Sequence, residues 1–278
     1  MRRRFMTPIV SGGVMANVGD IAYKATDGSI KVVAPDAWNS AFGAVIGVVV
    51  IPSGFAPDNG LARIVSLKWA STSSTSATSA ISIKWSNTNS ETRLPIYNRI
   101  PRISGSNTNG HFASDKFVGY TMSDTDPYAG YYRGAMGGFI PSPYLGDAPN
   151  PAYYAPISGY TNALSDFDGK GNTDVLAALG SDYAAATAAR KYKSAGAEEI
   201  VWYLPAAGEL GYLMARLNKI KTSLTLVSAA QLDGNYSFWL STKYSANNAY
   251  YFSISDGYIE YLSMNTSQYV RPFAQLDF

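Results

Sequence analysis

Few residues of this chain have the types and spacing that catalysis requires. The chain has one histidine, His111, in a polar stretch with a glycine beside it, and no cysteine. We expect this residue to be a surface-loop histidine and not the base of a serine–histidine triad, and one histidine cannot build a histidine-rich metal site. The absence of cysteine excludes disulfides, thiolate ligands and a cysteine nucleophile. We therefore expect no cofactor and no enzymatic activity of these classes.

Acidic residues offer two weaker possibilities. Oxygen-bearing side chains alternate from Asp166 to Asp174, as in a calcium loop, but the bidentate glutamate that ends an EF-hand loop is missing. We expect no metal there, with calcium binding as the alternative. Glu198 and Glu199 could supply the two carboxyl groups of a glycosidase, yet adjacent residues at a helix end are more often solvated.

Binding is better supported than catalysis by the composition of the C-terminal part. Between Asn235 and Tyr269 the chain has 7 of its 21 tyrosines, 7 serines and 4 asparagines, with only three charged residues. Tyrosine supplies a large amphipathic contact area at low entropic cost, and serine and asparagine supply adaptable hydrogen bonds. This stretch therefore has the composition of a binding surface, although ordinary strand aromatics are the alternative.

The overall composition indicates a globular protein. The 278 residues are 46% hydrophobic and 15% charged, which is enough for a buried core in one large domain or two ordinary ones. The net charge of +2 is too small to indicate a nucleic-acid partner. No apolar run approaches the roughly 20 residues of a membrane-spanning helix, and no signal-peptide pattern follows Arg2–Arg4, so we expect neither membrane insertion nor export.

The elements that must position the binding stretch are mostly strands. Residues 19–23 and 30–33 flank an Asp-Gly turn and predict a hairpin, and residues 44–51 form a β-branched run typical of a strand buried on both faces. Residues 62–69 predict a further strand. The tract of about 70–160 has no sustained period, and we expect a long irregular surface insertion.

Helical patterns follow that tract. Asn172 or Thr173 is expected to cap a first helix, and Asp182 an alanine-rich second one. The clearest helix opens at Pro205 and has its apolar residues at spacings of three and four. Those residues are Leu210, Leu213, Met214, Leu217 and Ile220.

Alternation within the C-terminal strands separates a core set from a contact set, because neighbouring strand residues face opposite sides. The predicted core set is Tyr250, Phe252, Ile254 and Ile259. The predicted outward set is Tyr251, Ser253, Ser255, Asp256, Tyr258, Glu260 and Tyr261. The preceding loop adds the contact residues Tyr244, Ser245, Asn247 and Asn248. Trp239 is expected in the core, and Arg271 is expected to pair with Glu209 or Glu198 because a buried arginine needs a partner.

Several landmarks in a fixed order carry a family resemblance. They are Gly19-Asp20-Ile21 with Asp27-Gly28, Ala44–Val49, Val65–Lys68, Asp168–Asp174, Trp202–Leu210, Phe238–Thr242 and Val270–Phe273. In this order the chain resembles the variable target proteins of diversity-generating retroelements, which share the C-type-lectin-like, formylglycine-generating-enzyme-like fold. Leu240 and Tyr250 depart from the usual serine and tryptophan, and the tract between Trp69 and Asp168 is unmatched.

The resemblance implies an α+β, C-type-lectin-like fold of short mixed strands and two main helices, with the long irregular insertion. The domain would span residues 16–278, after an N-terminal attachment arm of residues 1–15. The resemblance also implies a variable, ligand-binding region at 236–269, and a turn into a helix at Asp168–Asp174. The cysteine-dependent activity of the formylglycine-generating enzymes does not carry over.

The leading functional hypothesis is a phage virion protein of a tail or head fibre that attaches to the host. Its partners would be a host cell-surface protein or glycan at the tyrosine-rich face and other virion proteins at the arm. A homotrimer is expected, since fibres gain avidity from valency. Two alternatives remain open: a fibre depolymerase with an acidic pair in the insertion, and a structural capsid decoration protein.

Overall fold

The structure is a computed structural model. It describes residues 15–54, 60–73, 79–97, 131–133, 139–141, 163, 166–233, 236–254 and 258–278. The described part is a mixed α+β protein whose paired strands are antiparallel, which confirms the predicted class. His111, residues 1–14 of the expected N-terminal arm and most of the expected insertion lie outside the described residues.

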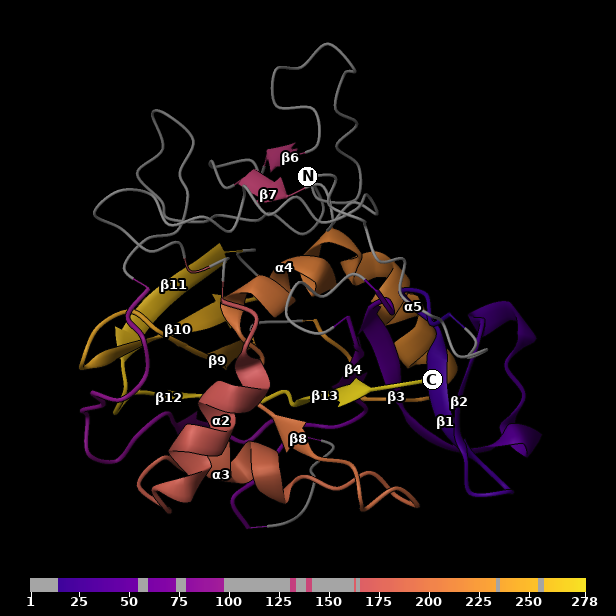
Figure 1. The fold of residues 1–278 in the computed structure, drawn as a ribbon, viewed down its shortest axis with the longest axis horizontal. Coiled ribbons are helices and arrows are strands. Elements are labelled where there is room, and N and C mark those ends of the chain that lie inside the picture. Colours follow the sequence, from indigo (N-terminus) through magenta and orange to yellow (C-terminus); the bar gives the residue numbers. More distant parts are fainter. Residues whose placement is uncertain are drawn as a thin grey trace, which may run out of the picture.

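A six-stranded sheet forms the centre of the molecule (Figure 1). Its strands, in spatial order, are β2 (Ile30–Val33), β1 (Ile21–Ala25), β3 (Gly43–Ile51), β4 (Ala62–Ser66), β13 (Phe273–Leu276) and β8 (Trp202–Tyr203). β1 and β2 are the predicted hairpin, and β3 is buried from Ile46 to Ile51 as its β-branched run predicts. The last strand of the chain lies between β4 and β8, so both ends of the described chain belong to one sheet.

Four α-helices are described, and two pairs pack around the strands. They are α2 (Gly169–Ala178), α3 (Ala184–Lys191), α4 (Ala207–Ala215) and α5 (Leu217–Leu226). Helices α4 and α5 pack against β3, whereas α2 and α3 pack against each other and against β8. Figure 1 shows the two pairs on opposite sides of the central sheet. Short 3-10 turns at Pro35–Ala37 and Ser40–Phe42 connect β2 to β3.

The helix boundaries differ from the sequence expectations. α2 begins at Gly169 with Asp168 as its N-cap, because the Asp168 carboxylate accepts a hydrogen bond from Gly171 N at 2.9 Å. The two glycines of the first turn have poor helix propensity and so concealed this start. α3 has Tyr183, not Asp182, as its N-cap, without a side-chain cap bond.

The predicted long helix is two helices. The chain leaves the helical conformation at Arg216 (φ −130°, ψ 20°), which separates α4 from α5. The buried stripe of Leu210, Leu213, Leu217 and Ile220 is nevertheless present and faces the main hydrophobic core. The period of the apolar residues was therefore informative about burial, although it did not show the break.

A second, three-stranded sheet carries the tyrosine-rich segment. Its order is β11 (Tyr258–Ser263), β10 (Asn248–Ser253) and β9 (Ser237–Lys243). The shorter pairs are β5 (Ile83–Lys84) with β12 (Ser267–Gln268), and β6 (Tyr131–Arg133) with β7 (Phe139–Pro141). Figure 1 shows the β9–β11 sheet at the end of the molecule remote from the β1–β2 hairpin.

The first part of the expected insertion is packed into the core. Trp85 is 1% exposed and donates its indole N–H to the carbonyl of Leu240 at 2.8 Å, and Trp239 donates to the carbonyl of Ile83 at the same distance. These reciprocal bonds join β5 to β9 from positions 155 and 156 residues apart. Within residues 83–97 the side chains of Ile83, Trp85, Ser86, Glu91 and Leu94 are therefore buried, whereas the others are exposed or half-buried. Trp239 is in the core, as predicted.

Arg271 does not have the partner that the sequence suggested. The carboxylate of Glu209 instead pairs with Arg63 at 2.9 Å, and both side chains are fully buried. Glu209 also accepts hydrogen bonds from the Tyr203 hydroxyl and from Ala206 N at the start of α4, each at 2.8 Å. Arg271 is fully buried and donates to the carbonyl of Ala230. The spacing along the chain could not show that β4, and not the segment before β13, supplies the arginine.

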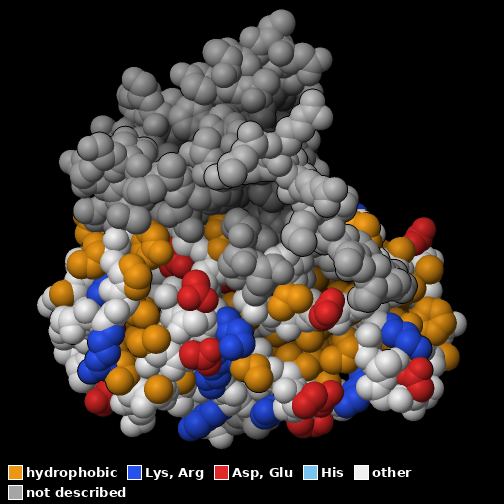
Figure 2. Space-filling view, viewed as in Figure 1, with side chains coloured by type: hydrophobic (Ala, Val, Ile, Leu, Met, Phe, Trp, Pro, Cys, Tyr) orange, Lys and Arg blue, Asp and Glu red, His pale blue; other side chains and the backbone are white. Residues whose placement is uncertain are grey.

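Charged side chains of both signs are interspersed over the described part of the face in Figure 2, so this face has no extended patch of one sign.

Among the described helices, none has the length and apolar character needed to cross a bilayer.

Candidate functional site

The β9–β11 sheet places the predicted core set as expected. Tyr250 and Ile254 are 1% and 6% exposed, and Phe252 and Ile259 are fully buried. All four belong to the main hydrophobic cluster, which also contains residues of α4 and α5. Burial of these aromatic and aliphatic side chains fixes which face of β10 points inward.

Two residues of the predicted outward set are buried. Tyr251 is 7% exposed and Ser253 is 2% exposed. The Tyr251 ring packs edge-on against Trp239 at 6.4 Å between centroids, and its hydroxyl lies 3.0 Å from a carboxylate oxygen of Glu260, to which it donates. The expectation that they are exposed is therefore wrong. Alternation assumes that one face meets solvent, whereas a second hydrophobic cluster covers this face of the sheet.

Three tyrosines, one directly after β9, one in β10 and one in β11, form an aromatic cluster at one end of the sheet. The rings of Tyr244 and Tyr261 are parallel, within 1°, with centroids 3.6 Å apart, and both are half-buried. Tyr250 packs edge-on against each of them, at 5.8 and 6.4 Å. We name Tyr244, Tyr250 and Tyr261 the tyrosine cluster. Tyr250, which is anchored in the core, supports the partly exposed pair from below.

Tyr250 is the uncharged, buried member of the tyrosine cluster. The hydroxyl of Tyr250 donates to the carbonyl of Tyr97 at 2.6 Å. Burial raises the pKa of Tyr250 well above its usual range, and the neighbouring Tyr244 and Tyr261 raise it further. Tyr250 thus contributes an uncharged ring and a hydrogen-bonded hydroxyl group to the cluster.

The hairpin loop beside the cluster is held by its own polar residues. Ser245 Oγ accepts hydrogen bonds from the backbone N–H of Asn247 and Asn248, at 3.3 and 3.1 Å, and from the Asn248 side chain at 3.0 Å. Ser245 therefore shapes the turn. Asn247 is exposed and Asn248 is half-buried, so Asn247 is the loop residue best placed for contact.

The remaining predicted contact residues are only partly described. Glu260 is exposed on β11. Ser255 and Asp256 lie outside the described residues, as does the side chain of Tyr258, although the Tyr258 backbone pairs with Ser253.

Sequence reasoning missed one segment of the site. Residues 91–97 run beside β9, because Lys243, which is 2% exposed, pairs with the buried Glu91 at 2.9 Å and Tyr97 N donates to the carbonyl of Lys243. Ile96 is 46% exposed next to this bond. The sequence placed these residues in an irregular insertion, and only the isolated Glu91, between polar residues, could have hinted at a buried partner.

The acidic residues of the run at 166–174 make contacts within the protein. Asp166 is 2% exposed and accepts hydrogen bonds from the Thr242 hydroxyl at 2.7 Å and from the Asn172 amide at 3.0 Å. Burial raises the pKa of Asp166 to about 6, against the opposing effect of these bonds. Asp174 pairs with Lys170 and Arg190. Among the described residues, no group of three carboxylate or histidine side chains is arranged to hold a metal ion.

The Glu198–Glu199 pair also has structural roles. Glu199 pairs with Lys24 on β1 at 2.7 Å, and a Glu198 carboxylate oxygen accepts from Gly196 N. The two carboxylates are therefore engaged in different local contacts. The site that remains is a contact surface of two stacked tyrosines, an exposed asparagine and an exposed isoleucine, whereas the exposed Glu260 lies on the other face of the sheet beside Tyr251.

No protein-family model matches the chain, and no curated protein matches it. Among solved structures, the chain is similar to a fimbrial protein from Bacteroides ovatus ATCC 8483, with a TM-score of 0.45 and 17% sequence identity. The match covers 94% of this chain and 49% of that protein, so the chain spans about half of its length. A likeness of this degree assigns no family.

Proposed function

We propose that this chain is a non-enzymatic ligand-binding protein of the adhesin type, with a C-type-lectin-like fold. Its ligand face is the end of the β9–β11 sheet at the tyrosine cluster. The family resemblance further suggests a phage virion protein that binds a host-surface protein or glycan. In this proposal a trimer multiplies weak single-site affinity, and the N-terminal arm attaches to other virion proteins.

The stacked pair of Tyr244 and Tyr261 carries the proposal. The pair is half-buried and is supported from below by Tyr250. Its side chains therefore lose little further conformational entropy when a ligand covers them. Tyrosines in such pre-organised positions supply much of the affinity in protein interfaces. Asn247 adds an exposed polar group from the loop that follows Tyr244. Glu260 belongs to the opposite face of the sheet, where its carboxylate accepts from the Tyr251 hydroxyl.

The test compares Tyr244→Ala and Tyr261→Ala with Tyr23→Ala. Tyr23 is a half-buried tyrosine of β1 that also contacts aromatic rings, so the control removes the same side chain elsewhere. Fluorescently labelled protein is screened on intact bacteria and on a glycan array, and the strains or glycans that bind the unchanged protein are then used with each variant. Circular dichroism establishes that each variant is folded.

We expect each cluster substitution to weaken binding about thirtyfold, since truncating a central aromatic contact costs about 2 kcal/mol. Tyr23→Ala should bind as the unchanged protein does. Equal binding by all three folded variants would refute the assignment of this face. Release of reducing ends from a bound polysaccharide, lost on substitution of an acidic residue, would instead establish a depolymerase.

A further inference from the structure

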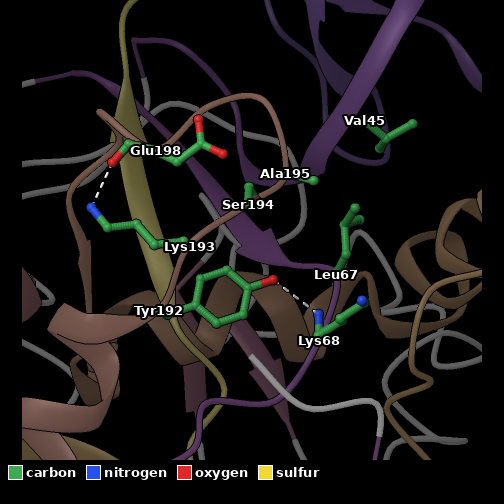
Figure 3. A pocket seen from close by; sticks show the side chains of 8 residues that line it. All are labelled: Val45, Leu67, Lys68, Tyr192, Lys193, Ser194, Ala195 and Glu198. Atoms are coloured by element: carbon green, nitrogen blue, oxygen red, sulfur yellow. Dashed lines mark hydrogen bonds between the residues drawn. The ribbon is translucent and has the colours of Figure 1, made fainter. Parts of the chain in front are cut away.

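Two pockets on the described part of the chain differ in how their charged groups are arranged. The first, of about 220 Å³, lies beside the Tyr192 ring, and Figure 3 shows the ammonium groups of Lys68 and Lys193 on opposite sides of that ring. These two charges therefore do not converge on one ligand. The second pocket, of about 270 Å³, lies between residues 88 and 90–93 and the segment that joins α2 to α3.

Hydrogen bonds hold the two walls of the second pocket together. Asn87 N donates to the carbonyl of Asp182 at 2.7 Å. The Ser90 carbonyl accepts from the Tyr183 hydroxyl and from Thr88 Oγ1, each at 3.2 Å. Tyr183 is 6% exposed, so the position of its ring is fixed by packing. The walls therefore need little further ordering when a ligand binds.

A buried carboxylate fixes the wall that carries Arg93. Glu91 accepts hydrogen bonds from the backbone N–H of Arg93 and Leu94, at 2.5 and 2.9 Å, and pairs with Lys243. The Glu91 N–H donates to the carbonyl of Ala246 at 2.8 Å. Although Glu91 lines the pocket, its charge is compensated within the protein.

Two charged side chains of the lining remain without a partner. Arg93 and Asp182 are exposed, and neither side chain makes an ion pair or a hydrogen bond with another described residue. Both act on the same tyrosine: burial raises the pKa of the Tyr183 hydroxyl, Arg93 opposes that shift and Asp182 adds to it. The two opposite charges, one from each wall, thus lie around one hydroxyl group of the pocket.

This lining suits a neutral ligand that is rich in hydroxyl groups. Arg93 supplies only donors and Asp182 only acceptors, whereas the serine and threonine hydroxyls of residues 88–92 can do both. A sugar hydroxyl also donates and accepts, so a sugar can bond to both charged groups. Leu179 and the Tyr183 ring add apolar surface for the C–H groups of a sugar ring.

We propose that this pocket binds a neutral sugar. Arg93 donates to oxygen atoms of the sugar, Asp182 accepts from one of its hydroxyl groups, and Leu179 contacts its C–H groups. The affinity of a single sugar is expected to be on the order of millimolar, because it has few non-hydrogen atoms. The pocket shares no residue with the tyrosine cluster, and this proposal does not rest on the function proposed for that cluster.

The test is an amide NMR titration of the full chain with glucose, galactose, mannose, fucose, N-acetylglucosamine and N-acetylgalactosamine. The amides of Thr92 and Tyr183 are the reporters, because they lie in the two walls. We expect saturable shifts at both amides with at least one sugar, equal at low and high salt, since salt does not screen the binding of a neutral ligand. Glycine is titrated separately. Saturable shifts with glycine that disappear at high salt, and none with a sugar, would show that the pocket selects a zwitterion instead.

Variants with matched controls test the two charges. Arg93→Ala and Asp182→Ala should each weaken sugar binding about tenfold, as expected for a lost hydrogen bond to a charged group. Lys68→Ala and Asp36→Ala remove a positive and a negative charge from exposed positions outside the pocket, and they should have no effect. Tyr244→Ala should also leave the sugar affinity unchanged, so this site and the tyrosine cluster are tested separately.

Amide shifts remote from the pocket establish that each variant is folded. Absence of saturable shifts with all of the sugars would overturn the proposal. Equal effects of the pocket variants and their controls would do the same.

Discussion

Removal of the Lys243 ammonium should destabilise the protein far more than removal of an exposed lysine in an equally short pair. Lys243 and Glu91 pair at 2.9 Å with side chains 1% and 0% exposed. Lys31 and Asp27 pair at the same distance, but their side chains are 48% and 60% exposed. The substitutions Lys243→Met and Lys31→Met therefore compare a buried ion pair with an exposed one at the same nitrogen–oxygen distance.

The magnitude follows from what each substitution leaves behind. Lys243→Met would leave the Glu91 carboxylate buried, with hydrogen bonds only from the backbone N–H of Arg93 and Leu94. Breaking a buried pair in this way costs about 3–5 kcal/mol, and the two remaining bonds favour the lower end. Water solvates Asp27 when Lys31 is removed, so no measurable loss is expected there.

Urea unfolding followed by tryptophan fluorescence measures both losses. Hydrogen exchange adds a local reading: the Tyr97 amide donates to the carbonyl of Lys243, so it should exchange faster in Lys243→Met. Adding Glu91→Gln to Lys243→Met should restore part of the stability, since a neutral amide is cheaper to bury. Equal losses of unfolding free energy for Lys243→Met and Lys31→Met would refute the argument that burial makes the Lys243–Glu91 pair important for stability.

Two further predictions concern the core. Burial raises the pKa of Asp166 from 3.8 to about 6, so its contribution to stability is complete below about pH 4 and is lost as pH rises through about 6. Relative to Asp166→Asn, the unchanged protein should lose on the order of 2–3 kcal/mol between pH 4 and 7; parallel pH profiles from urea unfolding would contradict this. Gly47→Ala should destabilise by about 1–3 kcal/mol, since its Cβ would lie 2.6 Å from the Val65 carbonyl oxygen. An unchanged thermal midpoint would contradict that overlap.

The sequence was most informative where one local rule acted alone. The Asp-Gly turn between two short strands gave the β1–β2 hairpin, and the β-branched run gave β3. The apolar spacing gave the buried faces of α4 and α5 but not the break at Arg216. The start of α2 was misplaced because capping by Asp168 outweighs the low helix propensity of its two first-turn glycines.

The residues of the candidate site were likewise predicted only in part from the sequence. Alternation found the inward residues Tyr250 and Phe252, and composition found the tyrosine-rich stretch. Neither could show that Tyr251 is buried, because that depends on Trp239 and the second cluster covering the other face. The ligand role of the whole contact set remains a prediction.

The sequence alone determined the composition of the binding stretch, the absence of cysteine chemistry, the alternation of the strands and an α+β class. Only the tertiary structure decided which tyrosines meet. Tyr244 and Tyr261 are 17 positions apart and stack because β10 pairs with both β9 and β11, which brings the residue after β9 beside β11. Such contacts follow from the closure of long loops and the burial of shared surface, which depend on the whole chain and leave no mark in a local pattern.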